Sequence, residues 1–404
     1  MILTANRRIA FSASRRLARD GWSAGESERV YGAGAERSWG SGENYEAHFV
    51  FSGAVDPETG MLVNLSDVKA ALAGVVDDRY DHRFVNLDTP PFDVVPPTPE
   101  NLARQLLAEA QRACAGLPAR LVACHLAESA LTAATAWAGG GVEREFFLEF
   151  SAARRTCSPH LSDEENTALF GNAASAAGHG HGYRLRVVLR GPVDAGTGLI
   201  APHAVARGAL MRLHEKLDHH HLNLEVPELA GMPMTTECLA RYVCRTLAAE
   251  LPVARVRLHE MPHFFAEHDG VRASLGLEGT FSAAHCLRRP GLSDDENRAI
   301  YGKCSNPNGH GHRYTVQATI GGAIDERTGT VFDLASFASG LAQALAPWDR
   351  RHLDLETDNF RAAPSTGENI VQALWPRLDA ALDRRLLRLR LFETSNNRFA
   401  LREA

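Results

Sequence analysis

The chain has 404 residues, of which 45% are hydrophobic and 23% are charged, the composition of an ordinary globular protein with two to four domains. Its formal net charge of −6 argues against a general nucleic-acid binder, but a local pocket can still attract an anionic small molecule. There is no apolar run of membrane-spanning length and no secretory signal, and seven scattered cysteines without a CxxC pair predict reduced thiols in a cytoplasmic protein.

One sequence unit occurs three times along the chain. Each copy contains the string Phe-Ser-Ala, followed in a constant order by a turn segment, a charged segment, a short segment containing Glu and an apolar run containing Glu. The matching strings are AVDPETGML, PVDAGTGLI and AIDERTGTV; DHRFVNLD, DHHHLNLE and DRRHLDLE; PTPEN, MTTEC and STGEN; and CHLAES, RLHEMP and RLFETS. Because order and spacing are kept, we predict three tandem copies, called copies 1, 2 and 3, at residues 1–138, 142–269 and 270–404.

The periodicity within a copy predicts its elements in chain order. Segments that alternate and are rich in β-branched residues predict strands, and the Asp-x-x-Thr-Gly segment predicts a turn in which Gly198 and Gly329 adopt positive φ. Two helical segments and two further strands complete the unit, which is therefore an α+β module. The predicted segments are strands at 183–191 and 313–322, helices at 236–251 and 334–346, and strands at 254–261 and 387–394.

The junctions between copies predict how the units are connected. Gly139–Gly141 joins copy 1 to copy 2, and Asp269–Gly270 lies between the strand-like segments HFFAEH and VRASLGLE. The second junction predicts a hairpin in which the last strand of copy 2 pairs with the first strand of copy 3. The three sheets would then be continuous, and closing them into a ring would remove the exposed edges. We therefore predict a covalent pseudo-trimer.

The full set of metal-ligating residues is intact only in copy 3. This copy reads FSAAH, ending at His285, and later CSNPNGHGH, which contains Cys304, His310 and His312. Three imidazoles are the ligand set of a catalytic zinc ion with an open position. The cysteine adds a candidate acid/base or nucleophile.

These motifs resemble the 6-pyruvoyl-tetrahydropterin synthase family, which includes 6-carboxy-tetrahydropterin synthase and has the tunnelling fold. The likeness covers nearly the whole chain and is strongest in copy 3, over FSAAH, LSDDEN, YGKCSNPNGHGHRY, STGEN and FETSNN. It implies a pseudo-trimeric antiparallel β-barrel of twelve strands with helices outside. It also implies that two chains stack face to face as a homodimer of pseudo-trimers.

The resemblance also assigns roles to residues of copy 3. It implies that zinc is held by His285, His310 and His312, and that Cys304 is the reactive cysteine. Glu393 matches the carboxylate that anchors the amino group and ring nitrogen of the pterin, and Glu368 matches a second acid of the pocket.

The family also uses an Asp-His pair from a neighbouring subunit. This pair falls on Asp349–Arg350 in copy 3, so the histidine is missing there, but it is kept as Asp218–His219 in copy 2 and Asp81–His82 in copy 1. We therefore expect one working site per chain, built across a boundary between copies. If copy 2 faces copy 3, the most altered metal positions, those of copy 1, face the Asp349–Arg350 segment that lacks the histidine. Both losses then fall at one inactive boundary, which favours Asp218–His219 as the catalytic pair. Asp81–His82 remains the alternative.

The matching metal positions in the other copies have changed. They hold Arg15, Ser41 and Glu43 in copy 1, whereas copy 2 keeps His179 and His181 but has Arg154 at the first position. An arginine cannot ligate zinc, and its fixed charge repels a cation. We expect no metal in copy 1 and at most weak binding in copy 2.

The implied activity is that of a zinc-dependent carbon–oxygen lyase of tetrahydrobiopterin biosynthesis. The substrate would be 7,8-dihydroneopterin triphosphate, which loses triphosphate as the 6-pyruvoyl product forms. The five residues between Cys304 and His310 resemble the pyruvoyl-forming branch. The carboxy-forming reaction of the queuosine pathway is an alternative. The other alternative is a catalytically silent protein that binds a pterin or serves in assembly. Arg350, which replaces the histidine of the pair in copy 3, favours this alternative, and the intact metal and cysteine residues of copy 3 oppose it.

Overall fold

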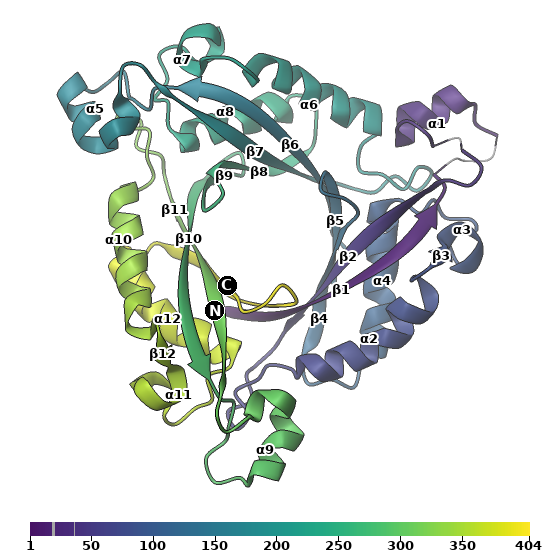
Figure 1. Ribbon diagram of the computed structural model, residues 1–404. Helices are drawn as coiled ribbons and strands as arrows, with labels where there is room; N and C mark the ends of the chain where they lie inside the picture. Colours follow the sequence, from purple (N-terminus) through teal and green to yellow (C-terminus); the bar gives the residue numbers. More distant parts are fainter. Residues whose placement is uncertain (18–20, 36) are drawn as a thin grey trace.

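Among the described residues, twelve strands close into one antiparallel barrel surrounded by helices (Figure 1). The computed structural model describes residues 1–17, 21–35 and 37–404. Each copy contributes four strands, which confirms the pseudo-trimeric tunnelling fold. The strands are β1 (Ile2–Arg15), β2 (Ser41–Ser52), β4 (Arg120–Ala127) and β5 (Thr132–Trp137) in copy 1; β6 (Val142–Arg154), β7 (His179–Arg190), β8 (Val253–Met261) and β9 (Phe264–His268) in copy 2; and β10 (Ala273–His285), β11 (His310–Gly322), β13 (Leu386–Phe392) and β14 (Asn397–Arg402) in copy 3.

Hydrogen bonding is continuous around the barrel. The predicted hairpin at Asp269–Gly270 is confirmed, because β9 pairs antiparallel with β10, and β5 pairs with β6 in the same way across Gly139–Gly141. The ring closes where β14 of copy 3 pairs with β1 of copy 1, from Ile2 opposite Arg402 to Arg7 opposite Asn397. Among the described residues, closure leaves no unpaired sheet edge along the body of the barrel.

Two long helices of each copy cover the outer face of its strands (Figure 1). Their N-caps are Asn, Thr or Asp side chains in five of the six cases, as expected where the first amides need acceptors. The helices are α2 (Leu65–Arg79), α4 (Pro99–Ala113), α6 (His203–Leu217), α8 (Thr236–Ala248), α10 (Leu334–Leu345) and α12 (Gly367–Ala381).

Shorter elements were missed by the sequence analysis. One short helix per copy lies between the first two strands and begins at a Ser-x-x-Glu capping box, a signal that the sequence does contain. A second short helix follows the Asp-His or Asp-Arg segment of each copy. These helices are α1 (Ala24–Tyr31), α5 (Asp163–Phe170) and α9 (Asp294–Tyr301), then α3 (Val85–Asp88), α7 (Leu222–Glu225) and α11 (Leu353–Glu356); the two-residue strands β3 (Arg83–Phe84) and β12 (Arg351–His352) lie beside β1 and β10.

The core lies between the barrel and its helices. Successive side chains of a strand point to opposite faces, so alternate residues of β10 and β11 face the helices. In copy 3 the rings of Phe281 and Tyr314 stack with centroids 4.8 Å apart, and Trp348 packs against Phe281. All three rings are buried, and each large apolar side chain buried in this way contributes about 1.5–3 kcal/mol. Tyr314 lies two residues after His312 on β11, so this stack holds the strand in place next to the histidine.

All seven cysteines are free thiols, as predicted from the sequence. In the described part of the chain, no helix has both the length and the apolar character needed to cross a bilayer.

Ring closure generates a stability prediction. Phe399 of β14 is buried against Gly367 at the start of α12 and lies opposite Ala5 of β1. Phe399→Ala removes this ring from the closing strand, and we expect the free energy of unfolding to fall by about 3–5 kcal/mol. Chemical denaturation followed by tryptophan fluorescence measures the change. Leu387→Ala, at a partly exposed position of β13, is the control and should cost about 1 kcal/mol or less.

Candidate active site

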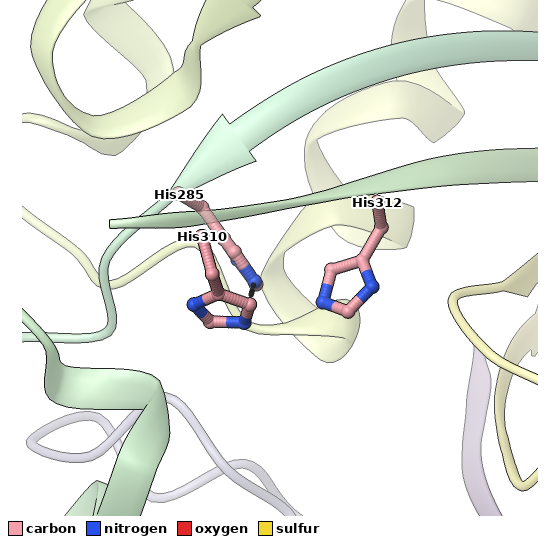
Figure 2. Close-up of side chains that lie close together, drawn as sticks. All are labelled: His285, His310 and His312. Carbon is pink, nitrogen blue, oxygen red and sulfur yellow. Dashed lines mark hydrogen bonds between the residues drawn. The ribbon is translucent and has the colours of Figure 1, made fainter. Parts of the chain in front are cut away.

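The three histidines of copy 3 meet on the outer face of the barrel, at the end of the β10–β11 pair (Figure 2). His285 is the last residue of β10 and lies directly opposite His310, the first residue of β11. His312 is two residues further along β11 and therefore points to the same face. One nitrogen of each ring lies within 4.8 Å of the others, and Nε2 of His285 is 3.0 Å from Nε2 of His310.

The backbone orients the most buried of these rings. Nδ1 of His285 lies 3.1 Å from the carbonyl oxygen of Ser365, to which it can only donate. This assigns the Nδ1–H tautomer and leaves the Nε2 lone pair directed at His310, an arrangement typical of metal-ligating histidines. Burial, and then the neighbouring His310, lowers the pKa of His285 to about 3. Burial also lowers the pKa values of His310 and His312, so all three rings are neutral near pH 7 and suited to hold a zinc ion.

Two carboxyl groups lie in the same region. Glu393 directly follows β13, its side chain accepts a hydrogen bond from Nδ2 of Asn397 at 3.2 Å, and burial raises its pKa. Glu368 lies in the first turn of α12, where its Oε1 accepts the backbone N–H of Leu62 from copy 1 at 3.0 Å. Burial raises the pKa of Glu368 to about 7. Glu393 and Glu368 are the two acids that the sequence predicts for the pterin pocket, and that role stays a prediction.

Cys304 lies in a single 3₁₀ turn, Gly302–Ser305, between α9 and β11 and is half-buried. Burial and the nearby Glu393 carboxylate raise the pKa of its thiol, and Lys303 opposes them. Cys286 lies next to a metal-ligand position, but its thiol is buried and donates to the carbonyl oxygen of Asn306 at 2.9 Å. Of these two thiols, Cys304 is therefore the one available for chemistry.

The copy 3 residues lie at the boundary with copy 1. The hydroxyl of Tyr301 donates to the carbonyl of Thr59 at 3.0 Å, and Arg289 forms an ion pair with Glu58 at 2.7 Å. Within one chain, copy 1 and not copy 2 therefore lies beside this half-site. Which copy supplies the Asp-His pair stays a prediction.

The Asp-His segments of the three copies share one conformation. Asp81 accepts the backbone N–H of Ser12 at 2.8 Å, and its other oxygen lies 2.8 Å from Nδ1 of His82. Asp218 and His219 repeat this arrangement on β6, and Asp349 accepts the N–H of Ser282 on β10. In the described ranges, no hydrogen bond, ion pair or ring contact joins His82 or His219 to the half-site of copy 3.

Arginine fills the corresponding positions of copies 1 and 2. Arg15 pairs with Ser41 across the strands as His285 does with His310, and Arg154 pairs with His179. The guanidinium of Arg15 forms a buried ion pair with Glu128.

The guanidinium of Arg154 contacts Glu260 at 2.5 Å, and His181 lies 3.0 Å from the same carboxylate. Glu128 and Glu260 hold the repeat position of Glu393, so the strings CHLAES and RLHEMP already contained this signal, which the sequence analysis did not use. In both copies a guanidinium therefore stands at the position of His285 and pairs with the acid.

The chain is similar to known proteins along almost its whole length. A family model described as 6-pyruvoyl tetrahydropterin synthase matches residues 4–138, 143–271 and 274–404. The 6-pyruvoyl tetrahydrobiopterin synthases of Pongo abelii and Homo sapiens are 42% and 41% identical over 128 residues, which span 31% of this chain and 88% of each relative. The structure of Caenorhabditis elegans 6-pyruvoyl tetrahydropterin synthase is 33% identical with a TM-score of 0.32, covering 32% of this chain and 95% of that one.

The copy 2 arrangement generates a metal-binding prediction. Arg154→His would place a third imidazole opposite His179 and remove the fixed charge, so we expect zinc to rise from about one to about two ions per chain. Arg15→His is the matched control; copy 1 offers Ser41 and Glu43 in place of the other histidines and should gain none. Equilibrium dialysis with elemental analysis measures both variants. An unchanged zinc content in Arg154→His would show that the guanidinium is not what prevents binding.

Proposed function

Because the chain belongs to the 6-pyruvoyl tetrahydropterin synthase family, we propose that it converts 7,8-dihydroneopterin triphosphate to a 6-pyruvoyl product with elimination of triphosphate. The observation that supports this most is the convergence of His285, His310 and His312 near Cys304 and Glu393 in one of three copies. The curated relatives with this similarity carry the 6-pyruvoyl name, which favours that product over the 6-carboxy product.

We propose that one zinc ion per chain is held by His285, His310 and His312. When bound, it would supply Lewis-acid polarisation of the side-chain oxygens of the substrate and so acidify the adjacent C–H bond. His285 is held for this role by Ser365, whose carbonyl fixes its tautomer.

The remaining groups would bind the pterin and move protons. The carboxylate of Glu393 would accept paired hydrogen bonds from the amino group and a ring N–H of the pterin, and these bonds favour its charged form despite burial. Glu368 would line the same pocket with one oxygen already committed to Leu62. The thiolate of Cys304 would remove and return protons at the side-chain carbons, with an Asp-His pair completing the relay.

We further propose that two chains stack through the end of the barrel that carries the Asp-His segments. Leu87, Leu224 and Leu355 follow these segments in the three copies and are all exposed. Exposed large apolar side chains repeated with the pseudo-symmetry of the barrel are typical of a contact surface. Size-exclusion chromatography with light scattering tests this assembly, and a monomeric mass would contradict it.

Product analysis tests the activity directly. Zinc-loaded protein is incubated without oxygen with 7,8-dihydroneopterin triphosphate, and the products are identified by mass spectrometry. A 6-pyruvoyl product with free triphosphate is expected. A 6-carboxy product with acetaldehyde would assign the same site to the other branch of the family, and the absence of turnover with zinc present would indicate a binding protein.

The role of Cys304 generates a further prediction. Cys304→Ala removes the proposed acid/base, and we expect turnover to fall by about 10²-fold or more while zinc content is unchanged. Cys286→Ala is the matched control because that thiol is buried and bonded to the backbone, and it should keep its turnover. Full turnover in Cys304→Ala would remove this cysteine from the mechanism.

A further inference from the structure

The Asp-His segments face solvent in an isolated chain. The side chains of His82 and His219 are 83% and 81% exposed, and that of Arg350 is 89% exposed. Each of these residues has a positive φ of 56–58°, and its backbone N–H donates to a serine carbonyl of the adjacent strand. Non-glycine residues rarely adopt this conformation, and it is kept where surrounding structure imposes it. Each segment is therefore held in place and directed outward.

The half-sites and the Asp-His segments lie at the same end of the barrel. The segments are anchored to Ser12, Ser151 and Ser282, each three residues before the first metal position on its strand. The leucines of α3, α7 and α11 at this end are 71%, 79% and 73% exposed. A surface with this threefold repetition fits a second copy of the same chain, related by a twofold axis perpendicular to the barrel.

We propose that the half-site of copy 3 in one chain is completed by Asp81–His82 from copy 1 of a second chain. The inference rests on the proposed function. It specifies the partner and also the pairing of copies, because the three copies of one chain differ and their possible pairings are therefore not equivalent. Each dimer then contains two complete sites, and each of these takes residues from both chains.

Three pairings of copies are possible when two such barrels meet face to face. In the first, copy 3 of one chain meets copy 1 of the other and copy 2 meets copy 2. In the second, copy 3 meets copy 2 and copy 1 meets copy 1. In the third, copy 3 meets copy 3, which would bring Arg350 rather than a histidine to the metal residues and leave no complete site.

The distribution of lost residues selects the first pairing. There, the half-site with three histidines receives Asp81–His82, and the copy 2 half-site, which keeps two histidines, receives Asp218–His219. The copy 1 half-site, which has Arg15 and no histidine, receives Asp349–Arg350. The complete half-site then faces a complete Asp-His segment, and the half-site without a histidine faces the segment that has lost its own histidine. The second pairing would instead place the intact Asp81–His82 against the half-site that has no metal ligand.

Complementation between two inactive variants tests the proposal. His82→Ala and Cys304→Ala chains should each lose about 10²-fold or more in turnover. Mixing them through a dissociation and reassociation step, or expressing them together, should restore about a quarter of the wild-type sites, because half of the dimers are mixed and each mixed dimer has one complete site. If the pair acted within one chain, mixing would restore nothing.

His219→Ala is the matched control for the choice of copy. It removes the same side chain from the same backbone conformation, and it should keep wild-type turnover. Loss of turnover in His219→Ala with normal turnover in His82→Ala would overturn the first pairing in favour of the second.

A cross-link tests the geometry without any turnover. His82→Cys should form a covalent dimer with Cys304 of the other chain under mild oxidation or with a short bismaleimide, as seen on a denaturing gel. The dimer should disappear in the His82→Cys, Cys304→Ala double variant and should not form with His219→Cys. A cross-link confined to single chains, or one formed by His219→Cys, would overturn the proposal. If the wild-type chain shows no turnover but the His82→Cys dimer forms, the proposed function fails and the pairing stands.

Discussion

Hydrogen bonds between the first and last strands hold the whole assembly together. When β14 pairs with β1, the remaining edges of the sheet are satisfied, and copy 3 is placed beside copy 1. The boundary formed in this way contains the bond from Leu62 to Glu368 and the contact of Tyr301 with Thr59. The candidate site is therefore a consequence of closure, because the acid and metal residues of copy 3 are supported by a copy that begins more than 270 residues earlier in the chain.

Fusion allows the three boundaries to differ, and electrostatics explains how two of them changed. Glu128 and Glu260 are largely buried carboxylates, and burying a carboxylate without a counter-charge is costly. Arg144 gives Glu128 a second positive partner at 3.6 Å. Arg15 and Arg154 supply that charge from the position of the first metal ligand. An arginine at this position thus takes the place of an imidazole and also compensates the acid. Copy 3 keeps neutral imidazoles instead, and its Glu393 remains free of any guanidinium among the described residues.

The repeat made most of the architecture predictable from sequence. Strings such as FSA and STGEN recur in order, so three copies, their long helices and the ring could be deduced, and the three histidines of copy 3 do converge. The start of β11 was placed three residues too late, because His310-Gly-His312 has no β-branched residues although it is fully paired with β10. Which neighbour lies beside the half-site could not be deduced, because copy 3 adjoins both other copies in a ring of three. The side on which its half-site lies depends on tertiary contacts such as Tyr301 with Thr59, which local patterns do not encode.

The short connections between copies have a consequence for assembly at low concentration. Three separate subunits must meet to close a barrel, so their association depends on concentration and they separate on dilution. Here the β5–β6 and β9–β10 connections keep all twelve strands on one backbone, and closure is an intramolecular event with a high effective concentration. Dilution can separate one barrel from another, but it cannot take a barrel apart into its three units.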